Sequence, residues 1–580
     1  MHHVPANRHL SLPTIVALAL LLPGTLEAQK ADLVFINANI LTVDEKFSQA
    51  TALAVKDGKI LAVGSNDDIL KLAGPKTRRI QLNGNTMLPG LIETHVHALG
   101  VGLSARQRTY IELNSIAELQ NWLRREAKLH PAGTWIRIPR ADITRLKERR
   151  HPTPAELDAA CTTHPVLFNA ARKNVLNTLG FRLLGITAQT QVLDGGKVIR
   201  DARGKVRMIA GGDTTIRKFF PPADVTEQQR QEALISVHHR YNQVGITSLF
   251  ERANNKAGYQ LYQQLQRSGK LTVRSTHTIR QQFRSADQVA SFTKSSGLLT
   301  GQGDDWVRVG PLKITVDGGI HWGTTHLREP YGPRRIRFYA LEGIQDPSWQ
   351  GSSRYTVNLM RDIFREGHKL GWQMCCHVTG DAGVDNVLQA LSLADADFPL
   401  ADRRFTLTHA YFPALDSIPL ARRLGVCVDT QSYLYYRDSE AIASVYGPRW
   451  ADRFIGLGDW LRGSIPTAIN SDHMIGMDPN HAMNSYNPFL LMQIAITRLN
   501  DAGNIHGRHQ CISRQQALRC YTSTAAYLGF EEDRKGSLEA GKLADLIVID
   551  RDYQSCPVDQ IKDIRVLQTM VNGKFVYERQ

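Results

Sequence analysis

Cysteine is scarce in this chain and follows no recognisable pattern. Seven cysteines occur in 580 residues, their spacings are irregular, and no Cys-x-x-Cys pair is present. This distribution does not indicate a disulfide scaffold, and the odd number leaves at least one thiol unpaired if every disulfide is internal. Cys375 and Cys376 are adjacent within an apolar run, where we expect small buried hydrophobic side chains.

Long apolar runs are also missing, with one exception near the amino terminus. Arg8 and His9 precede an apolar stretch over residues 10–22, and Pro23 to Ala28 follow it. This pattern predicts a signal peptide, residues 1–28, cleaved after Ala28. An uncleaved anchor is the alternative, although the stretch is short for a bilayer span. We therefore expect an exported protein, periplasmic or secreted, with no stable membrane span after cleavage.

Charge of one sign is not gathered into a block, although the formal net charge is +15. The densest basic patch comprises Arg145, Lys147, Arg149 and Arg150, and Glu148 interrupts it. We interpret the basic excess as mostly solvated surface and expect no nucleic-acid partner. A small-molecule substrate is the expected partner, and a homo-oligomer is compatible with the sequence.

Both ends of the chain have the pattern of short strands. Residues 31–38, 52–55 and 59–64 are strand candidates, and Asp57-Gly58 is a hairpin turn signal. Near the carboxyl terminus, residues 544–550 predict a strand and residues 568–577 a hairpin with an Asn-Gly turn. The simplest arrangement joins both ends into one small β-domain beside a central domain.

The central part of the chain alternates strand candidates with helical stretches, which is typical of a parallel α/β domain. The length accommodates a barrel of roughly 250 residues with insertions and a smaller domain. Residues from about 103 to about 230 are less regular and rich in arginine, and we interpret them as an insertion over the barrel mouth. The strand candidates occupy residues 245–250, 309–316, 373–378, 405–409 and 466–472.

His95-Val96-His97 ends an apolar run and is the first candidate metal motif. Strand side chains repeat every two residues, so both imidazoles lie on one face of a strand. Histidine is the commonest metal ligand, and a pair at the carboxyl end of a strand makes half of a metal site. An isolated His-x-His is also compatible with a chance pair, so the interpretation depends on partners elsewhere.

Ligand-type residues end four further strand candidates, namely Lys313, His377, His409 and Asp472. A single core histidine is more often structural than a ligand, but barrel enzymes build their sites from successive strand ends. Lys313 lies in an apolar run, where a buried ammonium must be paired, neutral or modified, unless it snorkels to water. Asp472 is compatible with a metal-binding proton acceptor and also with a helix N-cap.

Residues 89–97, Pro-Gly-Leu-Ile-Glu-Thr-His-Val-His, resemble the opening signature of the amidohydrolase superfamily. Within it the chain resembles amidohydrolase family 3, the YtcJ-type branch described as exoenzyme-regulatory-protein-like metal-dependent hydrolases. The likeness covers nearly the whole chain after the predicted signal peptide. The motifs that carry it are Trp135-Ile136 with residues 142–146, Lys313 to Gly319 with Glu329-Pro330-Tyr331, His377 to Asp381, Thr408-His409-Ala410, Ser471-Asp472 and Gly536 to Leu546.

The resemblance implies an α/β fold, a distorted (β/α)8 TIM barrel with a flanking β-sandwich built from both chain termini. Residues 29–88 would then form the amino-terminal part of the sandwich. Residues 89–530 would form the barrel, with the insertion at about 103–230, and residues 531–580 would complete the sandwich.

The resemblance also implies one or two divalent metal ions, most often zinc, held by His95, His97, Lys313, His377, His409 and Asp472. Carbon dioxide would be bound as a carbamate on Lys313. The implied reaction is hydrolysis of an amide or cyclic amide C–N bond by a metal-bound hydroxide, with Asp472 as the catalytic proton acceptor. A non-catalytic ligand-binding or regulatory barrel is one alternative, and decarboxylation or isomerisation at the same site is another.

Three stretches depart from the pattern of this branch. Residues 168–174 lack the Asp-Gly-His element common there, and Arg172 and Lys173 favour an anionic substrate instead. The loop after Lys313 carries His321 and Trp322 as candidate substrate-binding residues, although Trp322 also fits packing under a loop. Asp472 is followed by His473-Met474, which predicts an unusual pocket floor.

Overall fold

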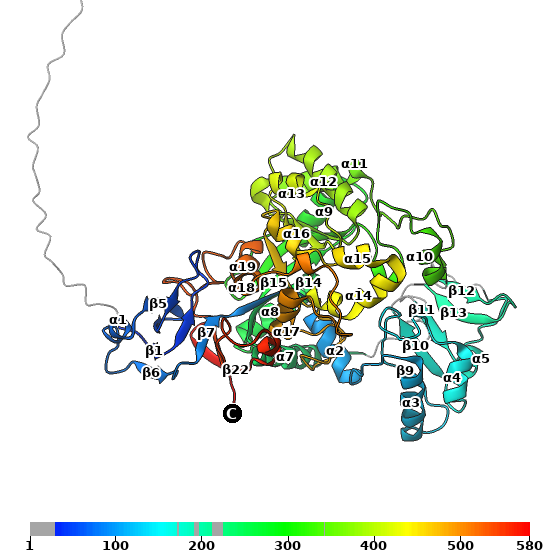
Figure 1. The fold of residues 1–580 in the computed structure, drawn as a ribbon, viewed down its shortest axis with the longest axis horizontal. Coiled ribbons are helices and arrows are strands. Elements are labelled where there is room, and N and C mark those ends of the chain that lie inside the picture. Colours follow the sequence, from blue (N-terminus) through cyan, green and yellow to red (C-terminus); the bar gives the residue numbers. More distant parts are fainter. Residues whose placement is uncertain (1–29, 171–172, 191–195, 212–223, 341–342) are drawn as a thin grey trace, which may run out of the picture.

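Eight parallel strands form a barrel at the centre of the computed structural model (Figure 1). The structure describes residues 30–170, 173–190, 196–211, 224–340 and 343–580, so the predicted signal peptide lies outside the described residues. The barrel strands follow one another in chain order around the sheet. They are β8 (Leu91–Val96), β14 (Ile246–Asn254), β15 (Arg274–Arg280), β16 (Val307–Thr315), β17 (Met374–Val378), β18 (Thr406–His409), β19 (Cys427–Thr430) and β20 (Thr467–Ile469).

A short pairing beyond the last strand closes the barrel. Val96 and His473 form a parallel β-bridge, and the His97 backbone N–H donates to the His473 carbonyl oxygen at 3.0 Å. The chain around Asp472 is thereby tied to the end of β8. The closure brings the first and the last candidate ligands of the sequence to the same edge of the barrel.

Two barrel strands, β15 and β19, escape prediction from the sequence. The sequence of β15 is Arg-Ser-Thr-His-Thr-Ile-Arg, and that of β19 is Cys-Val-Asp-Thr. Strands of parallel sheets usually carry near-continuous apolar runs, but these two bury polar side chains, such as His277 against Tyr259 and Tyr262 of the preceding helix. These strands are buried because other segments of the chain pack around them, and the local sequence does not reveal that burial.

Helices surround the barrel and connect successive strands, as expected for a (β/α)8 fold. Local chemistry sets several of their starts. Thr226 and Gln229 form a capping box at the start of α7, and Asn255 caps α8 by accepting from the Gly258 N–H. These helices are α2 (Ala98–Gln107), α7 (Glu227–Gln243), α8 (Lys256–Arg267), α9 (Ala286–Ser296), α10 (Gly332–Tyr339), α11 (Val357–Lys369), α12 (Asp381–Asp395), α13 (Ile418–Arg423), α14 (Ser432–Tyr446), α15 (Pro448–Arg453), α16 (Leu457–Arg462), α17 (Pro488–Thr497), α18 (Arg514–Cys520) and α19 (Ser523–Leu528).

Two further sheets lie beside the barrel and combine the two ends of the chain (Figure 1). One has the order β5-β4-β1-β6 and the other β23-β22-β21-β7-β2-β3. The second sheet pairs β7 with β21, so the predicted β-domain built from both termini is confirmed. Its elements are β1 (Leu33–Ile36), β2 (Asn39–Leu41), β3 (Gln49–Ala50), β4 (Ala52–Lys56), β5 (Lys59–Gly64), α1 (Asn66–Leu70), β6 (Arg78–Gln81), β7 (Thr86–Pro89), β21 (Leu546–Ile549), β22 (Val566–Val571) and β23 (Lys574–Glu578).

Both predicted hairpin turns are present and meet each other. Asp57 and Gly58 have φ of 49° and 76°, and Asn572 and Gly573 have φ of 54° and 72°. This left-handed backbone is what the favoured two-residue hairpin turns require. A Cβ added at Gly58 would lie 3.0 Å from Oδ1 of Asn572, so the close approach of the two turns also favours glycine there.

The insertion predicted between β8 and β14 forms its own five-stranded sheet, on the side of the barrel opposite the sandwich (Figure 1). The strand order is β12-β13-β11-β10-β9, and helices pack against it. Its elements are α3 (Ile116–Glu126), β9 (Ile136–Ile138), α4 (Pro154–Ala160), β10 (Val166–Ala170), β11 (Lys173–Leu176), α5 (Thr178–Leu183), β12 (Lys197–Arg200) and β13 (Val206–Ala210).

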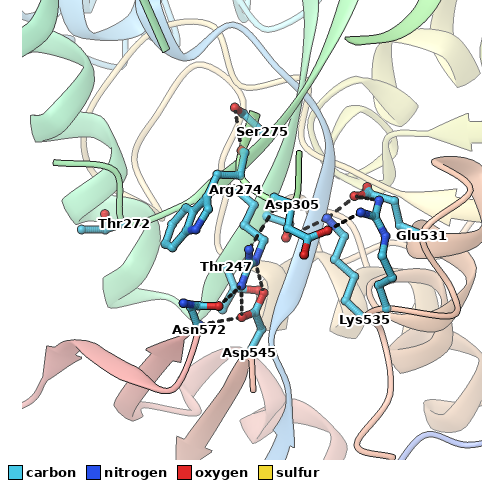
Figure 2. A network of polar contacts seen from close by, with 12 residues as sticks. Thr247, Thr272, Arg274, Ser275, Asp305, Glu531, Lys535, Asp545 and Asn572 are labelled. Atoms are coloured by element: carbon cyan, nitrogen blue, oxygen red, sulfur yellow. Dashed lines mark hydrogen bonds and ion pairs between the residues drawn. The ribbon is translucent and has the colours of Figure 1, made fainter. Parts of the chain in front are cut away.

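A buried ion pair fixes the sandwich to the barrel, as Figure 2 shows. The Arg274 guanidinium, at the start of β15, donates to Asp545 through Nε at 2.6 Å and Nη2 at 3.0 Å. It also donates to the Asn572 side chain at 3.3 Å and packs on Trp306. Two parallel charge-assisted hydrogen bonds define orientation as well as distance, so this contact sets how the two domains meet.

Two further features concern the cysteines and the lengths of the helices. All seven cysteines are free thiols, and Cys375 and Cys376 are buried in β17, as expected. Among the described residues, no helix combines the length and the apolar character that crossing a membrane requires.

Candidate metal centre and its cavity

Three ligand-type side chains from distant parts of the chain meet at the carboxyl end of the barrel. One ligand atom each of His95, His409 and Asp472 lies within 4.8 Å of the others. They come from β8, from the end of β18 and from the segment after β20. These atoms are close enough to share one cation.

The Asp472 carboxylate lies between two imidazoles. Its Oδ1 atom is 3.4 Å from Nε2 of His95 and 3.2 Å from Nε2 of His97. That oxygen and Nδ1 of His95 are buried and have no hydrogen-bond partner among the described residues. Buried polar atoms are rarely left unsatisfied in folded proteins, so this arrangement fits a shared cation better than a hydrogen-bonded cluster.

His377 is held as a neutral ring in a defined tautomer. Its Nε2–H donates to the Gly318 carbonyl oxygen at 2.8 Å, which leaves Nδ1 with a lone pair. Burial, assisted by the nearby Lys313 charge, lowers the pKa of His377 to about 3. Its ring centroid lies 4.5 Å from that of His409, so His377 belongs to the same cluster.

His409 is oriented by a relay of amide side chains. Its Nδ1–H donates to Oε1 of Gln431 at 2.8 Å, and the Gln431 amide donates to Oδ1 of Asn470 at 2.8 Å. All three residues are buried. The relay leaves Nε2 of His409 as the atom with a lone pair. Ligating histidines usually have such a partner on the other nitrogen, and it raises their affinity for a metal.

Lys313 is buried among the same residues. It lies in β16 with 5% of its surface exposed, so it does not snorkel to bulk water. Burial lowers its pKa, and the Arg252 charge acts in the same direction. The charge of Lys313 in turn contributes to the lowered pKa values of His95 and His377. The amine therefore lies close to the histidines and is biased toward its neutral form.

Two candidate ligands occupy a left-handed backbone conformation that residues other than glycine rarely adopt. His409 has a φ of 81° and Asp472 a φ of 51°. Such conformations cost roughly 1–3 kcal/mol each and gather at functional sites. Asp472 does not cap a helix, because the next helix, α17, begins at Pro488. The N-cap interpretation of Asp472 is therefore wrong.

Several residues that hold the site together are not recognisable in the sequence, and Asp317 is the first. It accepts hydrogen bonds from the backbone N–H groups of Thr379 and Gly380, both at 2.9 Å, and from His326 at 3.2 Å. It ties the loop after β16 to the loop after His377. Burial raises the pKa of Asp317 to about 7. In the sequence the residue signals only a turn before Gly318-Gly319.

Glu93 holds the segment that carries Asp472 in place through a hydrogen bond to its backbone. It is buried in β8, and its Oε1 accepts a hydrogen bond from the Ser471 backbone N–H at 2.9 Å. Burial raises the pKa of Glu93 to about 8. The sequence shows Glu93 only as part of the family signature, because its partner lies at the other end of the barrel domain.

A cavity of about 570 Å³ opens above the cluster. All six candidate ligands line it, and so do Arg140, Asp142 and Asn169 from the insertion. The insertion therefore forms part of the cavity wall. The candidate substrate-binding residues His321 and Trp322 line it as well.

His321 lies between two carboxylates rather than pointing only at the cavity. Its Nδ1 is 3.4 Å from Asp142 of the insertion, and its Nε2 is 3.4 Å from Asp438 of α14. Three separate segments thus meet at this imidazole. The structure gives His321 a bridging position in the cavity roof in addition to the predicted place on its lining.

Arg145 corrects one interpretation of the basic patch. Its side chain is 7% exposed, and it pairs with Asp438 through Nη2 at 3.1 Å and Nε at 3.2 Å. It is therefore not a solvated surface cation. Asp438 also accepts from Oγ1 of Thr144 at 2.8 Å, so α14 holds the insertion loop by several contacts.

The other residues that depart from the branch pattern lie partly in the cavity wall and partly in the core. Met474 lines the cavity. His473 is engaged elsewhere, since its Nε2–H donates to the Gly476 carbonyl at 2.7 Å and its Nδ1 accepts from the Tyr241 hydroxyl at 2.9 Å. Lys173 is buried in β11, and Arg172 lies outside the described residues.

Comparison with known proteins identifies the family of this chain. A model of the amidohydrolase family matches residues 78–577. The chain belongs to the amidohydrolase family. The predicted family is thus confirmed, and with it the fold and the enzyme class, a metal-dependent hydrolase of carbon–nitrogen bonds.

Two relatives match this amidohydrolase over almost its full length. The N-substituted formamide deformylase of Arthrobacter pascens is 26% identical over 570 residues, which cover 95% of this chain and 99% of the relative. YtcJ of Bacillus subtilis is 23% identical over 553 residues, which cover 93% and 98% of the two chains.

A solved structure shows the same fold. The structure of a metal-dependent hydrolase from Pyrococcus horikoshii aligns with a TM-score of 0.66 and 20% identity, covering 91% of this chain and 99% of that chain. Because the identity is low, this likeness concerns the architecture of barrel and flanking sheets alone.

Proposed function

We propose that this amidohydrolase cleaves the C–N bond of an N-substituted amide, with formamides as the first substrates to test. One observation carries the proposal. Oδ1 of Asp472 is buried 3.4 Å and 3.2 Å from two imidazole nitrogens and has no hydrogen-bond partner among the described residues. The substrate class is suggested by the formamide deformylase of Arthrobacter pascens, which aligns over 99% of its own length.

The donor set supports one or two divalent cations held by His95, His97, Lys313, His377, His409 and Asp472. Neutral imidazoles and a carboxylate suit zinc, and catalytic zinc sites keep one position open for water or substrate. Burial keeps His95, His377 and His409 neutral, because it lowers the pKa of each ring. A neutral ring can donate a lone pair at physiological pH, so we favour zinc.

We propose further that Lys313 carries a carbamate. The neutral amine attacks carbon dioxide, an N–C bond forms as one C=O π bond opens and leaves its electron pair on oxygen, and the nitrogen loses a proton to solvent. The product is an anionic carbamate that can hold two cations. The lowered pKa of the buried Lys313 supports this step, since only the unprotonated amine is nucleophilic.

The chain's own residues divide the remaining chemistry between them. A bound divalent cation supplies Lewis acidity and lowers the pKa of water to about 7. Asp472 accepts a proton from the attacking water and returns it to the nitrogen that leaves. Asn484 donates to the Asp472 backbone carbonyl at 2.8 Å, which keeps the carboxylate-bearing segment in place during both transfers.

Metal content and hydrolysis, measured on the same preparation, test the proposal. We expect the zinc-loaded protein to hydrolyse N-benzylformamide and the chelator-treated protein to lose this activity. Asp472→Asn should lower kcat by about 10²- to 10⁴-fold, whereas Asp478→Asn, on the exposed part of the same segment, should not. Undiminished turnover in metal-free protein would contradict the mechanism. Ligand binding without turnover would favour a regulatory barrel.

We also propose that the protein is exported and that residues 1–28 are removed. The basic, apolar and small-residue order at the amino terminus supports this. Mass spectrometry of the mature amino terminus, combined with cell fractionation, tests it. Recovery of the intact chain from the cytoplasm would contradict export.

A further inference from the structure

The cavity wall carries an arginine that has no counter-charge among the described residues. Arg280 ends β15 and lines the cavity. Within the described part of the chain, its guanidinium makes no hydrogen bond or ion pair. Beside it in the backbone, the N–H of Gln281 donates to the Lys313 carbonyl at 2.9 Å. The Cα of Arg280 is in register with that of Lys313, so the arginine emerges directly beside the cluster.

A second arginine reaches the same side of the cavity from another segment. Arg354 precedes α11 and lines the cavity, and its backbone N–H donates to the Val316 carbonyl at 2.8 Å. Arg280 and Arg354 therefore flank the carboxyl end of β16, one from the neighbouring strand and one from the loop above. Both charges also contribute to the field at His377.

The carboxylates of the cavity are already engaged. Asp142 faces Arg140 at 3.5 Å and His321 at 3.4 Å, and Asp317 accepts three backbone N–H groups. Asp472 faces the histidines. No acidic side chain among the described lining residues remains to neutralise Arg280. The side of the cavity next to β16 is therefore positive and open to an anion.

We propose that the substrate is an amide that also carries a carboxylate, and that Arg280 binds this carboxylate beside the metal centre, on the side of the cavity that Arg354 also lines. This inference rests on the proposed amide hydrolysis. Guanidinium groups bind carboxylates through paired, planar hydrogen bonds. Because Arg280 lies beside the end of β16, it would hold the carboxylate close to the scissile bond. N-acyl amino acids and related small amide acids therefore fit better than long neutral amides.

A matched pair of formamides tests the inference. N-formylphenylalanine and N-(2-phenylethyl)formamide share the formamide and the phenyl ring, but only the first has a carboxylate. For the zinc-loaded protein we expect kcat/KM to be about tenfold to a hundredfold higher for N-formylphenylalanine, mostly through KM. N-benzylsuccinamic acid has its carboxylate on the acyl side of the amide instead of the amine side. Its kcat/KM, compared with that of N-formylphenylalanine, shows on which side of the scissile bond the enzyme binds the carboxylate.

Variants of the arginine separate recognition from structure. Arg280→Met should lower kcat/KM for N-formylphenylalanine far more than for the neutral formamide, and should therefore remove most of the preference. Arg280→Lys keeps the charge and should restore part of the preference. Arg284→Met, an exposed arginine outside the cavity lining, is the matched control and should behave like the parent protein.

Binding provides a readout that does not depend on hydrolysis. Calorimetric titration of the Asp472→Asn protein with both formamides should show tighter binding of N-formylphenylalanine, and adding Arg280→Met should abolish the difference. Equal binding and equal kcat/KM for the two formamides would overturn the inference and leave amide hydrolysis standing. Selective binding without hydrolysis by the zinc-loaded parent would support the anion site and reject the proposed reaction. Equal losses for both substrates in Arg280→Met would also overturn the inference.

Discussion

Gln431 accepts the Nδ1 proton of His409 over 2.8 Å, and this single contact determines which nitrogen of the imidazole can bind a cation. Gln431 lies just after β19, a strand that carries no candidate ligand itself. The structure thus assigns the strand a supporting function in the site. Contacts of this kind allow the effects of substitutions on metal affinity, activity and stability to be predicted.

Replacing Gln431 should weaken metal binding without unfolding the protein. Gln431→Leu removes the acceptor that orients His409, and loss of such a partner typically lowers metal affinity 10- to 100-fold. Titration with a competing chelator measures the change. Gln373→Leu is a matched control, because Gln373 is also buried but donates to the Arg404 and Leu528 carbonyls instead. An unchanged zinc affinity in Gln431→Leu would argue against the orienting role.

Lys313→Ala should abolish hydrolysis, and small carboxylates should partly restore it. The variant opens space at the end of β16 where acetate or formate can replace the carbamate oxygens. We expect rescue to increase with carboxylate concentration in Lys313→Ala and to be absent in His409→Ala. Labelled bicarbonate followed by carbon NMR detects the carbamate on the parent protein directly. Full activity of Lys313→Ala without added carboxylate would contradict the carbamate.

His238 should make the fold sensitive to acid. Burial lowers its pKa to about 3, against an ordinary value of about 6.5. Below pH 6.5 the unfolded chain binds the proton and the folded chain does not, so stability falls as the pH drops from about 6.5 to about 3. The loss is about 1.4 kcal/mol per pH unit.

Unfolding curves at several pH values measure this effect. His238→Leu should flatten the dependence of stability on pH in that window, because both ring nitrogens are buried without partners in the described structure. His239→Leu, on the exposed face of the same helix, should leave it unchanged. Identical pH profiles for the two variants would contradict the assignment.

The Arg145–Asp438 pair should hold the insertion to the barrel. Asp438→Leu leaves a buried guanidinium without its carboxylate, which costs about 3–5 kcal/mol. The double variant Arg145→Met with Asp438→Leu removes both charges and should recover much of that loss. Denaturant unfolding measures stability, and limited proteolysis of residues 103–230 reports docking of the insertion. Additive losses in the double variant would mean that the two side chains do not act as a pair.

Local sequence patterns predict those parts of the fold that depend on local chemistry. Asp57-Gly58 and Asn572-Gly573 identify their hairpins because few other residues tolerate left-handed backbone at both turn positions. The candidate ligands follow apolar strand patterns, and these patterns alone are enough to place them at strand ends. The predicted and observed strand boundaries differ by a few residues. The candidate at residues 309–316, for example, corresponds to β16, which begins at Val307.

Contacts between distant segments are not predictable in this way. Arg145 and Asp438 are 293 positions apart, and the sequence around Arg145 shows only a basic patch. Gln431 and Asp317 carry no signal of their own, since an amide or a carboxylate after a strand is common in loops. Strand β15 escapes prediction because its polar side chains are buried by contacts with other segments, such as that of Arg274 with Asp545.

The sheet that combines both termini has a consequence for how the protein is made. β7 ends at Pro89, but its partner β21 begins at Leu546. At about 5–20 residues per second, the ribosome delivers the second strand between about 20 and about 90 s after the first. Until then the edge of β7 lacks its neighbour. A nascent chain of this protein therefore depends on chaperones, or on delayed folding, to prevent that edge from pairing with another chain.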